Sequence, residues 1–160
     1  MGSVFVRFYE AIIRLGEGLQ SFLLLAMRLY WGYGFFQSGM GKFNNLPKII
    51  EYFSSLNVPF PEANAYIVAS FETIGGILLM IGLGSRLICI PLICILCVAY
   101  ATAHIDALLN IFHDPETFIS QSPFNFLVAC LVVFCFGPGK FSIDYLLEKK
   151  KPNANNGAKS

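Results

Sequence analysis

The segment ANAYIVASFETIGGILLMIGLGSRLICIPLICILCVAYATAHI, residues 63–105, decides the fold. It contains two apolar runs, 63–83 and 86–105, and each is long enough to form a helix across the roughly 30 Å hydrocarbon core of a bilayer. Only a turn at Leu83, Gly84 and Ser85 joins them. Because so short a link returns the chain at once, it predicts an antiparallel helical hairpin.

Apolar runs at 19–40 and 123–136 complete the pattern, so we expect an all-α integral membrane four-helix bundle. Before the first run, apolar residues at helical spacing face charged residues, which predicts an interfacial amphipathic helix over 1–18. Pro47 predicts a short helix in the loop after the first span. The expected parts are therefore the helix 1–18, the bundle 19–147 and a polar, disordered cytoplasmic tail at 148–160.

Composition supports a membrane location and excludes several classes of protein. The 160 residues are 56% hydrophobic and 13% charged, against about 25% charged in soluble domains. A net charge of +1 provides no basic surface for nucleic acid. Most Lys and Arg residues lie in the N-terminal segment, in the turn near residue 86 and in the C-terminal segment. This distribution predicts a multi-pass protein with both termini in the cytoplasm.

Two charged residues lie inside the predicted spans. Arg28 is nine residues into the first span from one side, and Glu72 is nine residues into the second from the other. Because an isolated charge at that depth is costly, we expect Arg28 and Glu72 to form an ion pair in the bundle interior. Such a pair either fixes the register of the two helices or forms the charged wall of a ligand pocket.

Small residues accompany this pair. Gly32 and Gly39 share a helix face with Arg28, and Gly75 and Gly76 lie close to Glu72. Glycines at such spacing favour close packing of membrane helices. The alternative is that they open a cleft for a flat ligand beside aromatic side chains.

A second polar group is expected toward the other membrane surface, and it includes the only histidine near a span. Since an imidazole exchanges protons near neutral pH, this group suits proton transfer at a quinone, although such a histidine often only bonds a backbone carbonyl. The candidate residues for a ligand or quinone pocket are Trp31, Tyr33, Gln37, Lys42, Tyr66, His104 and Asn125.

The cysteines do not indicate redox or metal chemistry. All five lie in apolar runs, and Cys94 and Cys97 form a CxxC motif in the middle of a span. Reactive pairs of this spacing lie at exposed helix N-termini, so buried core cysteines are the better interpretation. The histidines and carboxylates are too sparse to predict a metal site.

Three stretches resemble the DoxX family of small bacterial membrane proteins: RLYWGYGFFQSGMGKF (28–43), SFETIGGILLMIGLGSRL (70–87) and FGPGKFSIDYLL (136–147). The resemblance extends over about residues 20–147. It implies a four-helix protein of the bacterial inner membrane. It also implies a link to quinone-dependent redox complexes, because the family takes its name from a subunit of a thiosulfate:quinone oxidoreductase. It supplies no catalytic residue.

Two functions from different classes follow. The first is an accessory or quinone-interacting subunit of a membrane redox complex, which makes the chain at most one subunit of an oxidoreductase. Its cofactor candidate is a diffusible quinone, since no haem, flavin or iron–sulfur ligands are present in the sequence. The second is a non-enzymatic assembly or stress-response protein that binds lipid or partners, including other redox subunits or further copies of the chain. Buried ionisable residues are also typical of transporters and proton pathways, so a small transporter or proton pathway is a third candidate.

Overall fold

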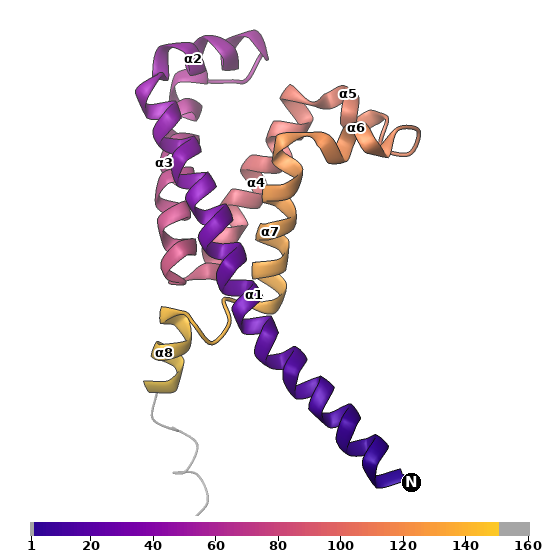
Figure 1. Ribbon diagram of the computed structural model, residues 1–160. Coiled ribbons are helices and arrows are strands. Elements are labelled where there is room, and N and C mark those ends of the chain that lie inside the picture. Colours follow the sequence, from indigo (N-terminus) through magenta and orange to yellow (C-terminus); the bar gives the residue numbers. More distant parts are fainter. Residues whose placement is uncertain (1, 151–160) are drawn as a thin grey trace, which may run out of the picture.

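The computed structural model describes residues 2–150. This part of the chain is all α-helical and contains eight helices and no strand. Figure 1 shows how these helices are arranged. Their bounds are α1 Gly2–Asn44, α2 Leu46–Ser55, α3 Pro61–Ile81, α4 Ser85–Ala103, α5 Ile105–Leu109, α6 Pro115–Ser120, α7 Ser122–Phe136 and α8 Ile143–Lys150. The predicted all-α class is confirmed.

Four of these helices form the body of the molecule. The second half of α1 packs along α3, and α4 packs along both α3 and α7. The helix α2 lies at one end of this body with α5 and α6, and α8 lies at the other end, beside the α3–α4 turn (Figure 1). We call these the α2 end and the α8 end. The core between the helices is apolar and consists of Phe35, Leu79, Cys89, Leu92, Leu96, Cys130 and Val133.

The helix α1 differs from the expectation. It runs for 43 residues without a break, so the predicted interfacial helix 1–18 is not a separate element but the first part of a helix that continues into the body. The reason is local: this stretch contains no proline, and Gly16 and Gly18 weaken a helix without breaking it. Figure 1 shows this first part leaving the bundle alone.

Two helices, α3 and α4, are long and apolar enough to cross a membrane, with 33% and 22% of their most apolar windows buried inside the protein. The helix α7 is apolar but has only 15 residues. The hairpin between α3 and α4 turns at Gly82, whose positive φ of 72° is unfavourable for residues with a side chain. The predicted disordered tail, 148–160, begins inside α8, and its residues from 151 onward lie outside the described residues.

Candidate functional site

The register between α1 and α3 is set by contacts of their glycines. Gly32 lies against the backbone of Gly76 and against Met80, and Gly39 lies against Ala69 and Thr73. A Cβ atom added at Gly76 would come within 2.6 Å of the backbone nitrogen of Phe36, so any side chain there would force the helices apart. This close approach determines which polar residues of the two helices can meet.

The predicted Arg28–Glu72 ion pair is wrong. In the observed register Arg28 lies opposite Gly82 at the α8 end, whereas Glu72 is 2.5 Å from the ammonium group of Lys42 near the α2 end. The expectation failed because it counted depth from the predicted ends of the spans, and those ends do not fix how far one helix is shifted along the other.

Arg28 instead binds the backbone of the segment between α7 and α8. Its side chain is buried, and its Nη1 and Nη2 donate to the carbonyl oxygens of Pro138 and Phe141 at 2.6 and 2.7 Å. These carbonyl groups lie outside any helix and need donors. Since a guanidinium carries several donors in a fixed plane, one side chain serves both. Arg28 therefore fixes the C-terminal segment against α1.

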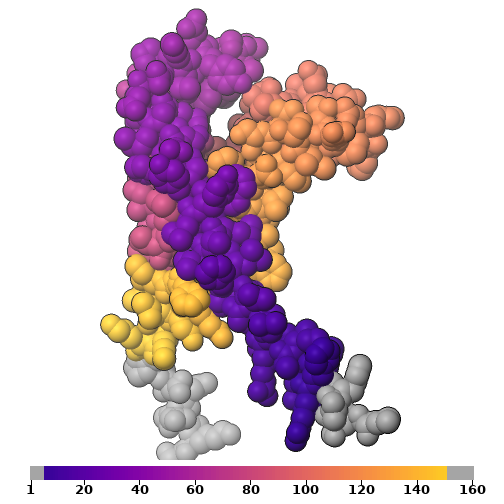
Figure 2. Space-filling model, viewed as in Figure 1, coloured from indigo at the N-terminus to yellow at the C-terminus, as the bar shows by residue number. Residues whose placement is uncertain are grey.

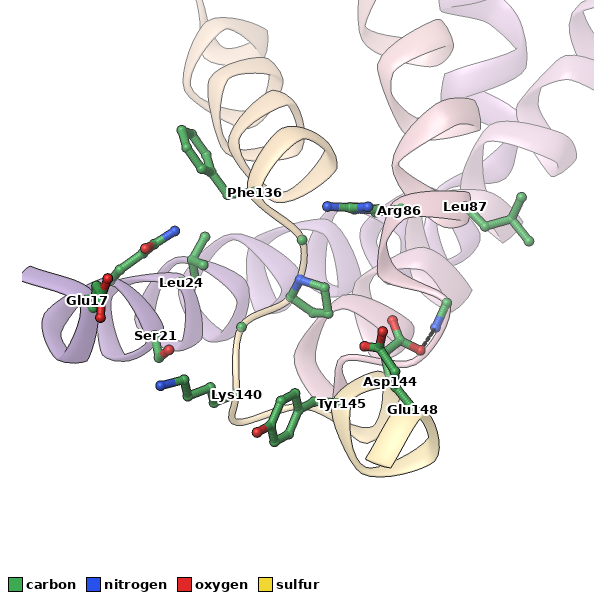
Figure 3. Close-up of a pocket in the computed structure, with 15 residues that line it drawn as sticks. Glu17, Ser21, Leu24, Arg86, Leu87, Phe136, Lys140, Asp144, Tyr145 and Glu148 are labelled. Atoms are coloured by element: carbon green, nitrogen blue, oxygen red, sulfur yellow. Dashed lines mark hydrogen bonds between the residues drawn. The ribbon is translucent and has the colours of Figure 1, made fainter. Parts of the chain in front are cut away.

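The same segment stabilises the start of α4. The carboxylate of Asp144, on α8, accepts hydrogen bonds from the backbone nitrogens of Gly84 and Ser85 at 2.7 and 3.0 Å. The helix α4 thus has an N-terminal cap provided from 60 residues away in sequence. Figure 3 shows Asp144 beside this helix start, at the edge of a crevice of about 840 Å³. The crevice also contains Glu17, Arg86 and Lys140.

A second cavity, of about 560 Å³, lies at the α2 end between α1, α2, α3, α4 and α7. Figure 2 shows the surface hollowed there, between α2 and the side formed by α5, α6 and α7. Most of its wall is apolar or aromatic, and it includes Phe35, Tyr52, Phe53, Ile95, Leu96 and Phe126. A hollow of this size and character suits a small, largely apolar ligand.

Charged and polar groups also line this cavity. Lys42 donates to Ser38 at 2.8 Å and to Glu72. The side chain of Lys42 is 20% exposed and that of Glu72 only 8%, so the pair is largely shielded but one partner remains accessible. Asn64, Thr102 and the half-buried His104 lie along the same wall.

A sequence model of the DoxX family matches residues 23–105, just over half of the chain. The chain belongs to the DoxX family. Together with the two apolar helices, this membership indicates a membrane protein. The matched region of this DoxX protein contains Arg28, Lys42, Glu72 and His104, and therefore most of the cavity wall.

Two relatives are similar over most of their length. A Bacillus subtilis protein named "Putative oxidoreductase CatD" is 27% identical over 133 residues, which are 82% of this chain and 91% of the relative. An uncharacterized protein of Haemophilus influenzae is 27% identical over 142 residues, which are 86% of this chain and 89% of the relative. No solved structure matches the chain.

Of the residues predicted for the pocket, only Lys42 and His104 line the cavity. Gln37 donates to the hydroxyl of Tyr33 at 3.0 Å on the exposed side of α1. Trp31 packs edge-on against Phe126, and Tyr66 and Asn125 are exposed away from the cavity. Within the part of the chain that the structure describes, no group of three or more metal-ligating side chains lies together.

Sequence reasoning missed the contribution of α2 and the role of Glu72 in the cavity. The glycine pattern contained a signal for the position of Glu72. Pairing Gly32 with Gly76 and Gly39 with Ala69 places Glu72 level with Phe36. The nearest cation on α1 is then Lys42, six residues later, and not Arg28, eight residues earlier. The wall residues from α2, such as Tyr52 and Phe53, carried no comparable signal, because their position depends on how the loop folds back.

Proposed function

We propose that this DoxX protein is a membrane subunit of a redox complex and that it binds a quinone in the cavity at the α2 end. The observation that carries the proposal is the composition of that cavity. Its wall is mostly apolar, it contains the partly exposed Lys42 side chain paired with a shielded carboxylate, and the imidazole of His104 also lines it. The name of the Bacillus subtilis relative includes the word "oxidoreductase", which supports a redox role.

The wall residues fit the chemistry of a quinone. A quinone head is flat, with two carbonyl oxygens, and its isoprenoid tail is apolar; when bound, it supplies reversible transfer of two electrons and two protons. The side chain of Lys42 is 20% exposed, and its ammonium group can donate a hydrogen bond to one carbonyl oxygen. The half-buried Phe126 lines the cavity and can provide an aromatic face for the head.

Two groups in the wall can hold and exchange protons. Glu72 is bonded to Lys42, so a carboxylate and an ammonium group share one site and can adjust to a change of charge nearby. His104, at the end of α4, can donate and accept hydrogen bonds through its two ring nitrogens, which lets it relay protons between this site and the membrane surface. Electrons come from a partner subunit in this proposal, since the role is that of an accessory protein.

The proposal also includes the location of the chain. Four segments cross the bacterial inner membrane: residues 19–40 of α1, then α3, α4 and α7. Both termini lie in the cytoplasm. The clustering of Lys and Arg at the N-terminal segment, Arg86 and the segment 140–151 supports this orientation. The α2 end, and with it the cavity, then lies on the opposite side of the membrane.

Lipid extraction of the purified full chain tests quinone binding. Protein isolated from quinone-replete membranes is extracted with organic solvent, and the quinone is measured by chromatography. We expect a stoichiometric amount in the natural protein. Ala99 lines the cavity, so Ala99→Phe narrows it and is expected to reduce the amount of bound quinone.

The matched control is Ala101→Phe, which places the same side chain at an exposed position two residues further along α4. It retains the quinone. Equal melting temperatures of the two variants exclude misfolding as the cause of a difference. Quinone absent from the natural protein, or equally present in both variants, contradicts the proposal.

A further inference from the structure

One side of α1 carries a regular apolar stripe that no other part of the described chain covers. Its eight residues follow each other at alternating steps of four and three, and all are exposed: Phe8, Ile12, Leu15, Leu19, Phe22, Ala26, Leu29 and Tyr33. The seven large side chains are between 47% and 65% exposed. We call this set the free stripe. Alternating steps of three and four are the pattern of the contact line between two supercoiled helices.

Lipid does not account for the whole stripe. Residues 17–24 of α1 lie level with the α3–α4 turn, because Glu17, Ser21 and Leu24 line the same crevice as Gly84 and Arg86. Phe8, Ile12 and Leu15 therefore extend beyond the α8 end of the bundle. A helix of 43 residues is about 65 Å long at 1.5 Å per residue, roughly twice the hydrocarbon thickness of a bilayer.

The membrane surface is a poor partner for this part of α1. The helix continues straight into the bundle (Figure 1), so its first half cannot lie flat on the surface while its second half packs along α3. Helices that bind membrane surfaces carry mostly Lys and Arg on the polar face. Here the polar face has two cations and two anions, Arg7, Glu10, Arg14 and Glu17, and so no net attraction for anionic lipid.

We propose that the free stripe is the interface of a homodimer in which the α1 helices of two copies pair in parallel. Both copies have the same orientation in a membrane, so the twofold axis lies along the membrane normal and each residue of the stripe faces itself. Ala11 and Gly18 flank the stripe and allow the helices to approach closely. A parallel helix pair of seven turns buries on the order of 800 Å² per copy, the size of a standard stable interface.

Disulfide cross-linking in membranes tests the pairing. Cys94, Cys97 and Cys135 are exposed and are first replaced by alanine in the full chain. Leu15→Cys is then added, and copper phenanthroline supplies the oxidant. We expect a dimer on non-reducing gels. The control is Glu10→Cys, which lies on the opposite face of α1 and gives several-fold less dimer. Absence of dimer at Leu15, or equal amounts at both positions, overturns the proposal.

A second measurement separates the dimer from binding to the membrane surface. Leu15→Glu changes a residue that is 65% exposed, so the fold of one copy stays intact. Light scattering in detergent then reports a monomer where the natural chain is a dimer. A nitroxide attached at Leu15→Cys is expected to show spin–spin coupling. If lipid-soluble oxygen speeds the spin relaxation of this nitroxide and no spin–spin coupling is seen, the stripe contacts lipid and the proposal is overturned.

Discussion

The two ends of the bundle use buried charge differently. At the α8 end, Arg28 donates to two backbone carbonyl groups and Asp144 accepts from two backbone nitrogens, so both side chains stabilise the fold. At the α2 end, Lys42 and Glu72 bind each other in the wall of a cavity. Charge bonded to backbone supports structure, whereas a charge pair facing a cavity remains available to a ligand.

The largest expected effect tests the structural role of the α8 end. Arg28→Met leaves two partly buried carbonyl groups without donors and removes a buried side chain that bonds to both, and we expect a loss of about 3–5 kcal/mol in the free energy of unfolding. Unfolding in detergent followed by circular dichroism measures it. Arg28→Lys retains the charge but reaches fewer acceptors and should lose less. Arg14→Met, at an exposed site, is the control, and an equal loss there contradicts the assignment.

The register that separates the two ends depends on Gly76. In Gly76→Ala the new methyl group meets the backbone of Gly32 and Phe36, which cannot move without parting the helices. We expect a loss of about 1–3 kcal/mol in the free energy of unfolding. Gly41→Ala, with nothing within 4 Å of the added atom, should be neutral or slightly stabilising. Similar melting temperatures for the two variants would show that close helix contact does not set the register.

At the α2 end the expected effect on stability is smaller. Lys42→Met leaves Glu72 without its partner, and we expect a loss of about 1–2 kcal/mol in the free energy of unfolding. The double variant Lys42→Met/Glu72→Gln should regain part of this, because no carboxylate then remains shielded from water. Chemical denaturation measures both. A loss as large as that of Arg28→Met would remove the proposed distinction between the ends.

The smallest effect lies outside the bundle. Hydrogen bonds from the side chain and backbone of Thr117 lower the pKa of Asp114, the N-cap of α6. A lowered pKa in the folded state means that this contribution is present above the ordinary pKa of about 4 and is lost as the pH falls through the lowered value. The melting temperature of Asp114→Ala should therefore be slightly lower than that of the natural chain at pH 6. In strong acid the two melting temperatures should be equal.

Much of the fold follows from the sequence. The runs 63–83, 86–105 and 123–136 differ by no more than two residues at either end from α3, α4 and α7, because apolar length and flanking glycine or proline fix where such helices begin and end. The course of α1 was not predicted, since the charges from Arg7 to Glu17 suggested a separate surface helix. Sequence spacing cannot show whether a helix bends away or continues straight.

The site was less predictable than the fold. Lys42 and His104 were identified from their chemistry, but the partner of Glu72 depended on the shift between α1 and α3. A shift of a few residues exchanges one cation for another at the same carboxylate. Only the glycine contacts determine that shift, and they act through backbone distances that residue types alone do not give.

The bonds of Arg28 also have a consequence for the order of assembly during synthesis. Its acceptors, Pro138 and Phe141, are 110 and 113 residues later in the chain. The ribosome therefore makes the arginine long before the carbonyl groups that bind it, and its guanidinium lacks these two acceptors until residues 138–141 have been synthesised. The segment between α7 and α8 completes the contacts of Arg28, so a chain terminated before residue 136 is expected to be degraded as incompletely folded.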